Sequence, residues 1–231
     1  MSSAAPEATC QPGPSPTARA LRLEGLRAPD AAALRALLTR LSEPPWDVEL
    51  ADDDPALPLV RAEGFEPYAR VAVMARPIAN FPRAPYIGGV EVVDYSNDDA
   101  DAFTALEAAA MDGLAAFAEM GQPTGYEQAA GFDVFLVARG VDGDLLGFAQ
   151  TMTPEGWINW FGVSPDARRI GIGHLLLAET ARRIADDRGS HLVARVEVDT
   201  PGQAFLSALG FRERGSRHTL LIRRAETPAG S

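Results

Sequence analysis

The sequence predicts an α/β protein, more exactly of the α+β type, with a mixed sheet flanked by helices. Strand and helix signals alternate along the chain, as they do in proteins of this class. Apolar residues make up 46% of the 231 residues and charged residues 23%, which is enough apolar surface for a packed core. No apolar run reaches the roughly 18 residues of a membrane-spanning helix, so we expect no contact with a membrane.

The first part of the chain, residues 19–78, predicts a small α/β subdomain. Leucines at helical spacing from Leu34 to Leu41 predict a helix, which Pro44-Pro45 ends. Alternation of apolar and polar residues predicts the strands. The expected elements are a helix at 30–42, a strand at 48–50, a helix at 53–64 and a strand at 68–75.

The second part, residues 88–225, predicts a larger domain. Phe103 and Leu106 lie near one face of a long predicted helix, and Val141-Asp142-Gly143-Asp144 is a hairpin signal. The expected helices lie at 99–119, 171–187 and 201–209. The expected strands lie at 90–95, 132–139, 145–152, 157–163, 191–198 and 217–224.

Segments with little to bury surround these two parts. Residues 1–18 consist largely of Ala, Pro, Ser, Gly and Thr and predict a disordered tail, and residues 226–231 predict another. Prolines and an asparagine over residues 79–87 predict a linker. The first residues lack the basic and apolar regions of a secretory signal, so we expect a cytoplasmic protein.

The ionisable residues exclude several functions. The net charge is -11, and such a surface opposes general binding to nucleic acid. All 21 basic residues are Arg, so Schiff-base chemistry on Lys and a Walker-type phosphate loop are excluded. The single cysteine cannot form an internal disulfide or a Cys-based zinc site, and the three histidines are far apart, so we expect no metal.

The most informative stretch, Val163 to Leu176, follows a predicted strand and enters a predicted helix. Backbone amides at a helix start form an anion site. Gly171 and Gly173 lack a Cβ, so a phosphate can come close to the backbone, and Arg168 and Arg169 add positive charge. The stretch therefore predicts a cradle for a diphosphate.

Arg168-x-x-Gly171-x-Gly173 resembles the acetyl-CoA-binding motif of the GNAT superfamily of N-acyltransferases. Gly210-Phe211, between a short helix and a last strand, resembles the usual end of that fold. The resemblance covers about residues 88–225. It implies the GNAT fold, a twisted mixed sheet whose fourth and fifth strands, here 157–163 and 191–198, splay apart.

The resemblance also implies how acetyl-CoA, as cosubstrate, would bind. Backbone groups near Phe161 and Val163 would pair with the pantetheine arm. Amides of the residues that enter the helix would hold the pyrophosphate. These residues are Arg169, Ile170, Gly171, Ile172 and Gly173, with Arg168 beside them. An amine would then attack the thioester directly, helped by a base and by a backbone N–H that polarises the thioester oxygen.

The chain departs from the family pattern where acid and base groups are expected. Leu206 stands where many relatives carry a tyrosine that protonates the leaving thiolate, and Trp157 stands where a carboxylate is common. The remaining catalytic candidates are polar residues near the two splayed strands. They are Glu155, Asn159, Glu197 and Asp199. Each has an ordinary structural explanation as well, such as a turn, a solvent-facing strand position or a helix cap.

The first part of the chain is a candidate for a degenerate half-copy of the GNAT domain. Gly64-Phe65 precedes Gly210-Phe211 by 146 residues, and the helix–strand–helix–strand order agrees with residues 171–224. Arg22-x-x-Gly25 falls at the same offset but without the second glycine. Alternatively, residues 20–41 correspond to the first strand and helix of a GNAT domain. In both cases the cradle is incomplete, so we expect no acetyl-CoA in this part.

The sequence leaves two functions from different classes. The first is an acetyl-CoA-dependent N-acetyltransferase that acts on a small-molecule or peptide amine, and the acidic charge favours a cationic acceptor. The second is a non-catalytic acyl-CoA-binding or regulatory module. A dinucleotide site would need a third glycine that the motif lacks. A homodimer is a candidate assembly.

Overall fold

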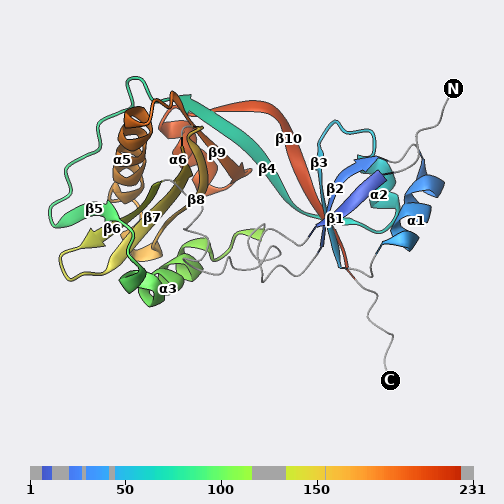
Figure 1. The fold of residues 1–231 in the computed structure, drawn as a ribbon, viewed down its shortest axis with the longest axis horizontal. Helices are drawn as coiled ribbons and strands as arrows, with labels where there is room; N and C mark the ends of the chain where they lie inside the picture. Colours follow the sequence, from blue (N-terminus) through green and yellow to red (C-terminus); the bar gives the residue numbers. More distant parts are fainter. Residues whose placement is uncertain are drawn as a thin grey trace. The chain divides into compact units, whose positions relative to one another are not determined.

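The computed structural model describes residues 7–11, 21–27, 30–41, 45–115, 134–153 and 155–224. They form two compact units (Figure 1). Unit 1 contains the described residues up to Ala72, Leu114 and Ala115, and the residues from Gly215 on. Unit 2 contains the rest. None of the described helices is both long and apolar enough to cross a bilayer.

The elements alternate along the chain as the sequence predicted. The helices are α1 (Ala31–Arg40), α2 (Leu57–Ala62), η1 (Asn97–Asp99), α3 (Ala100–Met111), η3 (Pro165–Ala167), α5 (Ile172–Asp186) and α6 (Pro201–Ala208). The strands are β1 (Glu7–Gln11), β2 (Leu21–Arg27), β3 (Trp46–Ala51), β4 (Glu66–Pro77), β5 (Val90–Asp94), β6 (Val134–Gly140), β7 (Leu145–Met152), β8 (Trp157–Val163), β9 (His191–Glu197) and β10 (Arg212–Arg223).

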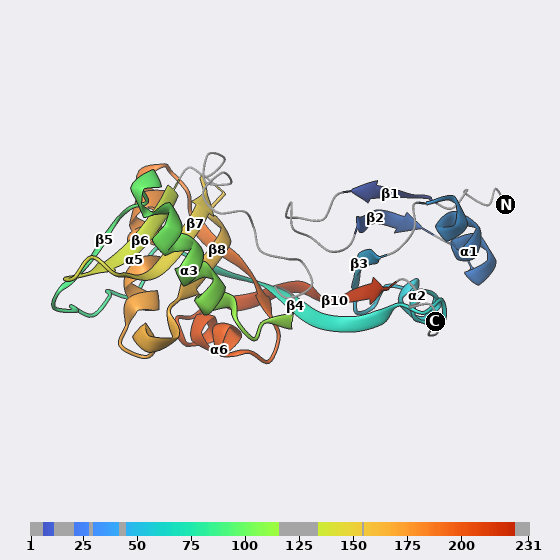
Figure 2. The same cartoon turned by 90° about the horizontal axis from the view of Figure 1, so that it is seen from below.

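In unit 2 the strands lie in the order β4-β9-β8-β7-β6-β5. Neighbours from β5 to β8 are antiparallel, whereas β8 and β9 are parallel. Helix α3 covers one face of this sheet and α5 covers the other (Figures 1 and 2). Phe103 of α3 lies edge-on to Phe148 of β7, with 5.0 Å between ring centroids. A Cβ added to Gly147 of β7 would instead meet Leu176 of α5 at 3.0 Å.

Helices α5 and α6 share one hydrophobic core with β8 and β9. Leu177 and Ile184 of α5, Leu206 of α6 and Leu192 of β9 all belong to it. Leu177, Ile184 and Leu192 are fully buried, at 0% exposure. The side of the sheet that carries α5 also carries α6, and α3 lies on the other side.

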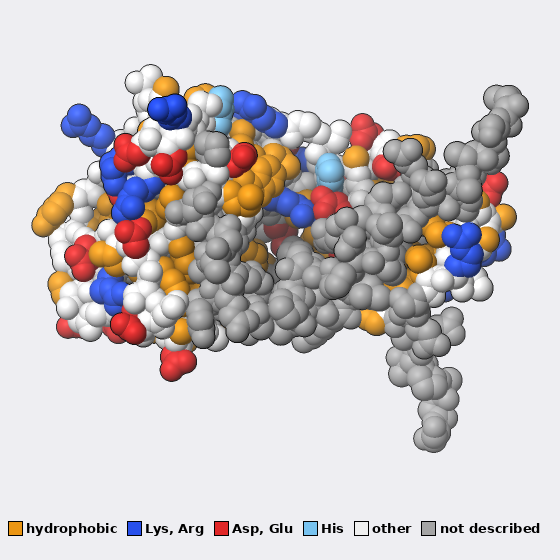
Figure 3. Space-filling model, viewed as in Figure 1, with side chains coloured by type: hydrophobic (Ala, Val, Ile, Leu, Met, Phe, Trp, Pro, Cys, Tyr) orange, Lys and Arg blue, Asp and Glu red, His pale blue; other side chains and the backbone are white. Residues whose placement is uncertain are grey.

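The surface of unit 2 mixes charges of both signs. Arg182 of α5 contacts Glu179 and Asp186 on the same helix, and Arg183 contacts Glu179 at 2.9 Å. On the face drawn in Figure 3, acidic and Arg side chains are interspersed over this unit. The net charge of -11 therefore does not make this face uniformly acidic.

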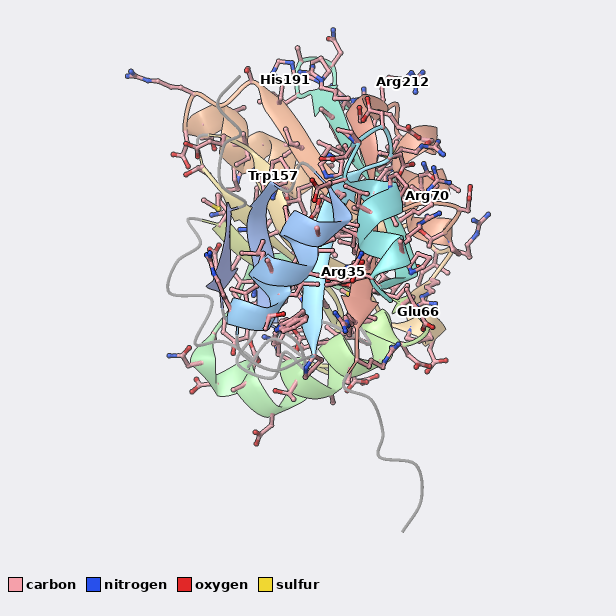
Figure 4. The ribbon with its side chains drawn as sticks, turned by 90° about the vertical axis from the view of Figure 1, so that its right-hand side faces the viewer. Arg35, Glu66, Arg70, Trp157, His191 and Arg212 are labelled. Carbon is pink, nitrogen blue, oxygen red and sulfur yellow. The ribbon has the colours of Figure 1, made fainter. Side chains whose placement is uncertain are left out.

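In unit 1 the strands lie in the order β1-β2-β3-β10-β4. β1 is antiparallel to β2, β2 is parallel to β3, and β3 is antiparallel to β10. Helices α1 and α2 lie on one side of these strands (Figure 4). Leu34, Leu38 and Val60 of the two helices pack with Trp46 and Leu221 of β3 and β10. This core is separate from the core of unit 2.

Two long strands pass from one unit to the other. β4 begins in unit 1 and its residues from Val73 on belong to unit 2, where β4 lies beside β9. β10 begins in unit 2 and its residues from Gly215 on belong to unit 1, where β10 pairs with β3. Each unit thus completes its sheet with a strand that starts in the other.

The predicted half-repeat is visible in backbone geometry. Gly64 and Gly210 have φ of 84° and 86°, and the phenylalanines that follow them are 2% and 1% exposed. The same two hydrogen bonds close both turns. They are Gly64 N to Arg61 O (3.1 Å) and Phe65 N to Val60 O (3.3 Å), and Gly210 N to Ser207 O (2.9 Å) and Phe211 N to Leu206 O (3.0 Å). Strands β4 and β10 also begin and end 146 residues apart.

The connections favour the half-repeat over the alternative match to a first strand and helix. β2–α1–β3 is a parallel crossover, like β8–α5–β9. The first strand and helix of the larger domain, β5 and α3, instead lead to an antiparallel neighbour, β6. Arg22 and Gly25 lie within β2, so their match to the glycine motif has no counterpart in backbone structure.

Several expected boundaries differ from the structure. The helix expected over 53–64 covers only Leu57–Ala62. Residues 7–11, expected in a disordered tail, form β1 because the edge of β2 offers backbone partners that composition does not reveal. The helix expected over 99–119 ends at Met111, before Gly113 with φ of 81°. The last strand starts at Arg212 rather than 217, since its exposed polar start hides the alternation. Residues 1–6, 12–18, 116–119 and 226–231 lie outside the described part.

Candidate active site

The two central parallel strands of unit 2 separate soon after they begin. β8 and β9 pair only at Trp157 with Val193 and at Ile158 with Ala194. Both strands continue for several described residues beyond these pairs. Trp157 and His191, near the start of each strand, are labelled in Figure 4. The splay expected between the strands at 157–163 and 191–198 is therefore present, and it opens toward their carboxyl ends.

A bulge in β8 lies where the splay begins. Thr151 and Gln150 of β7 are consecutive, but their partners Ile158 and Trp160 are two residues apart, which leaves Asn159 as the extra residue. A bulge turns the backbone and re-aims the side chains that follow it. Asn159, one of the predicted site residues, is thus at the branch point of the two strands.

After the bulge, successive β8 side chains point to opposite faces of the sheet. A Cβ added to Gly162 would meet Ala110 of α3 at 2.8 Å, so Gly162 and Trp160 face α3. Phe161 faces the other way and stacks on Phe205 of α6, at 5.8 Å between centroids and 6° between planes. The splay thus has an aromatic side chain of β8 on each face.

Beyond the end of β8, the chain turns into α5 without a side-chain cap. Gly171 is the N-cap residue with φ of 102°, and Arg169 also has a positive φ of 69°. The first turn of α5 contains no acidic residue. The first helical bond runs from Leu175 N to Gly171 O, so the amides of the preceding residues have no acceptor inside the helix. Such a helix start is suited to an anion.

The side chains of the glycine motif have structural contacts as well. The Arg168 guanidinium donates to the Val163 carbonyl at 3.3 Å and to the Ala110 carbonyl at 3.1 Å, so it fastens the turn to β8 and α3. A Cβ on Gly171 would lie 2.9 Å from Pro85, and a Cβ on Gly173 would lie 3.0 Å from Phe205. Close packing therefore favours glycine at both positions, in addition to any approach of a phosphate. Arg169 and Ile170 are exposed.

The predicted linker at 79–87 lies against the same turn. Besides the contact of Pro85 with Gly171, the imidazole of His174 lies 3.0 Å from the Pro82 carbonyl, and Phe81 lies edge-on to its ring. This segment therefore supports the start of α5, which the sequence did not indicate.

The predicted acidic candidates lie at different ends of the splayed strands. Glu155 is exposed in the turn before β8, at the end where the strands are still paired. Glu197 ends β9, and its carbonyl accepts from Thr200 Oγ1 at 2.7 Å. Asp199 is exposed with φ of 62°, and its amide donates to Gln203 Oε1 at 2.8 Å. Glu197 and Asp199 thus lie at the open end of the splay, and their roles stay predictions.

Leu206, at the position of the family tyrosine, is buried. Its side chain is 6% exposed and packs in the core of unit 2. This position provides no proton donor. In the described part of the chain, no group of three or more His, Cys, Asp or Glu residues is arranged to hold a metal ion.

One acidic residue near the splay was missed at the level of sequence. Glu107 of α3 is 2% exposed, and its burial raises the pKa to about 7, while an interaction with the Trp160 side chain acts in the opposite direction. The signal was present in the sequence. Glu107 comes four residues after Phe103 and three before Ala110, on the apolar face of the predicted helix.

Comparisons with known proteins agree with this geometry. Residues 131–213 match the model of the acetyltransferase (GNAT) domain family. No curated protein matches the chain in sequence. Three similar solved structures share 16–20% of their residues with it, which is evidence for the fold alone.

One of these structures is a GCN5-related N-acetyltransferase from Sphaerobacter thermophilus, with 20% identity and a TM-score of 0.61. The match covers 83% of this chain but only 64% of that protein, less than two thirds of its length. A tandem GNAT protein from the clavulanic acid biosynthesis pathway has 16% identity and a TM-score of 0.63, covering 92% and 77% of the two chains.

A GCN5-related N-acetyltransferase from Kribbella flavida has 17% identity and a TM-score of 0.60, covering 98% of this chain and 91% of its own. The splayed strands, the glycine turn and the family match over residues 131–213 lead to one conclusion. The chain has the GNAT fold, and its residues 131–213 are similar to the acetyltransferase (GNAT) domain family.

Proposed function

We propose that this protein is an N-acetyltransferase that transfers an acetyl group from acetyl-CoA to a primary amine of a small molecule or a peptide. One observation carries the proposal. An uncapped helix start at Gly171 lies at the end of the turn after a strand, β8, that has parted from its parallel neighbour. The first feature is suited to a pyrophosphate, and the second leaves strand backbone free for an extended arm.

The residues present fit such a cosubstrate. The main chain of Phe161 and Val163, on the open stretch of β8, would pair with the pantetheine arm. The amides from Arg169 to Gly173 would hold the pyrophosphate. Acetyl-CoA supplies the activated acyl group, and the residues around the splay orient it and exclude water.

The amine would reach the thioester from the face of the sheet that carries α3, because α5 and α6 fill the other face. The net charge of -11 favours an acceptor that is cationic in solution. We propose that the reaction takes place in the cytoplasm, and the single cysteine is consistent with a reducing compartment.

A second function is favoured by one specific observation. Leu206 cannot donate a proton to a leaving thiolate, and it is part of the core. A non-catalytic module that binds acyl-CoA would need the turn at Gly171 but no acid. The two functions therefore differ in turnover and not in binding.

A thiol-release assay separates them. Purified protein is mixed with acetyl-CoA and a panel of small amines and peptides, and free coenzyme A is followed with a thiol reagent. The acetyltransferase releases thiol only when an amine is present. Tight binding by calorimetry, without release for any amine, would instead establish the module.

The anion site is tested with a matched pair of charge reversals at residues that flank α5. Arg169→Glu places a carboxylate at the start of the helix, whereas Arg188→Glu makes the same change at its other end. Both residues are exposed and have positive φ, 69° and 66°. We expect Arg169→Glu to lower acetyl-CoA affinity about tenfold or more and Arg188→Glu to leave it unchanged. Equal affinities in calorimetry would refute the proposed site.

A further inference from the structure

Glu107 lies inside the protein on the face of the sheet where we place the acceptor. It belongs to α3, which packs on β7 and β8, and 2% of its surface is exposed. Its neighbours on the same helix face, Phe103 and Ala110, are buried and apolar. A carboxyl group in such surroundings costs stability unless it has a partner.

The partner of Glu107 is a residue at the branch point of the splayed strands. The side chain of Trp160 faces α3 and interacts with the carboxyl group, favouring its ionised form. Trp160 follows the bulged residue Asn159, just after β8 leaves β9. Trp160 pairs with Gln150 of β7, which is 3% exposed, so both side chains lie on the face of the sheet that carries α3. Glu107 is thus connected to the point where the thioester is expected.

The charged groups around Glu107 do not neutralise it. β7 and β8, which pack against α3, contain no ionisable side chain. At the ends of α3, Asp99 is paired with Arg139 at 2.8 Å and Arg168 donates to the Ala110 carbonyl. Tyr95 stacks on Phe135, and Arg195 lies on β9. Among the described residues Glu107 forms no ion pair, which distinguishes it from a carboxylate kept for a structural salt bridge.

We propose that the Glu107 carboxylate is the base that takes the proton from the acceptor ammonium, directly or through one water molecule. This inference rests on the proposed function. The ammonium gives one proton to the carboxylate, and the free amine nitrogen forms a bond to the thioester carbonyl carbon. The carbon–sulfur bond breaks, coenzyme A leaves as a thiolate, and the thiolate receives the second proton that the nitrogen loses. Glu107 then releases its proton to water.

The burial of Glu107 is what suits it to this step. Desolvation raises its pKa to about 7, so near neutral pH it is a stronger base than an exposed carboxylate yet still partly ionised. The interaction with the Trp160 side chain favours the ionised form and limits the rise of the pKa. Glu155 and Asp199, the exposed candidates, lack such an environment.

The kinetic test compares Glu107→Gln with Asp101→Asn, which removes a carboxylate from an exposed position of the same helix. We expect Glu107→Gln to lose about 100-fold or more in kcat with unchanged acetyl-CoA affinity, and Asp101→Asn to keep the full rate. The wild type should show an acidic limb in kcat/KM near pH 7 that Glu107→Gln lacks. Trp160→Phe should move this limb to higher pH. A Glu107→Gln variant with wild-type rate and pH profile overturns the assignment.

A second readout does not depend on turnover. The Trp160 indole N–H resonance, followed by NMR in protein without cosubstrate, should shift with pH near 7, and Glu107→Gln should abolish the shift. An indole that does not titrate there overturns the proposal even if the enzyme is active. If the indole titrates but the wild type releases no thiol with any amine, the proposed function itself fails. The two failures are therefore distinguishable.

Discussion

Two regions of this chain follow the same plan, yet only one has the uncapped helix start that we propose as a cosubstrate site. β8–α5–β9–α6–β10 and β2–α1–β3–α2–β4 share their order, their parallel crossover and the hydrogen bonds of the glycine–phenylalanine turn. They differ at the start of the crossover helix. α5 begins at Gly171 without a side-chain cap, whereas Asp30 caps α1 by accepting from Ala33 N at 2.8 Å.

This difference separates the part of the fold that has a structural role from the part that we propose binds acetyl-CoA. The Asp30 carboxylate occupies one of the first-turn amides that an anion would need, and its charge repels a phosphate. Only residues 28–30 separate β2 from α1, whereas eight residues join β8 to α5. The glycine–phenylalanine turn, by contrast, is present in both regions because it positions a buried ring in each core.

The largest effect is expected from separating the two regions. A chain that starts at residue 84 lacks β4, which lies beside β9 and buries Met74 at 2% exposure in the core of unit 2. We expect it to lose cooperative thermal unfolding and acetyl-CoA binding, measured by circular dichroism and calorimetry. A chain that starts at residue 12, and so lacks only β1, is the control and should keep both. Full binding by the shorter chain would show that the shared strands are not needed.

The next effect tests whether the two turns are equivalent. Phe65→Ala and Phe211→Ala each remove a buried ring after a glycine of positive φ. We expect each to cost about 3–5 kcal/mol in denaturant unfolding. Phe205→Ala, at a half-buried ring of α6, should cost less. If Phe211→Ala lowered the free energy of unfolding while Phe65→Ala changed it little, the two turns would not be equivalent, because the first turn would then lack a structural role.

A third prediction contrasts one carboxyl group from each unit. The pKa of Glu107 in unit 2 is raised, so the folded state binds more protons than the unfolded state between pH 4.5 and about 7, and stability falls over this range. Glu107→Gln should therefore be more stable than the wild type at pH 8, by up to about 3 kcal/mol, and equally stable at pH 4.

Asp52 in unit 1 should behave in the opposite way. The Thr219 hydroxyl, which donates at 2.6 Å, and the Arg70 guanidinium lower its pKa. Its carboxylate stabilises the fold above the unfolded pKa of 3.8, and this contribution is lost as the pH falls through the lower folded value. Asp52→Asn should thus be less stable than the wild type at pH 8. Denaturant unfolding at pH 8 and pH 4 measures the stability of each variant relative to the wild type. If the two variants changed stability in the same direction at pH 8, the environments assigned to Glu107 and Asp52 would be contradicted.

The sequence was sufficient for most of the fold because its signals are local. Leucine spacing located α1, alternation located β3 and β4, and the motif around Gly171 located the turn before α5. The offset between Gly64-Phe65 and Gly210-Phe211 predicted the half-repeat, since a buried ring after a left-handed glycine has a distinct pattern. Helix ends and the start of β10 were less well placed, because polar residues continue through them.

The site was less accessible from sequence because its properties depend on nonlocal packing. No pattern showed that the Arg168 side chain would bond to carbonyls of β8 and α3. The burial of Glu107 depends on how α3 packs against β8, where Trp160 meets it. The spacing of Glu107 from Phe103 was the available signal. The predicted catalytic residues, by contrast, all lie on or beside the splayed strands.

The smallest expected effect concerns the cap that distinguishes α1 from α5. Asp30→Ala removes the acceptor for Ala33 N and should cost about 1 kcal/mol of stability in denaturant unfolding, whereas Asp30→Asn keeps an acceptor and should cost less. Neither change should alter acetyl-CoA affinity, because α1 lacks the longer turn that precedes α5. A gain of acetyl-CoA affinity in Asp30→Ala would mean that the cap alone prevents binding in the first region. The length of the turn would then be irrelevant to binding.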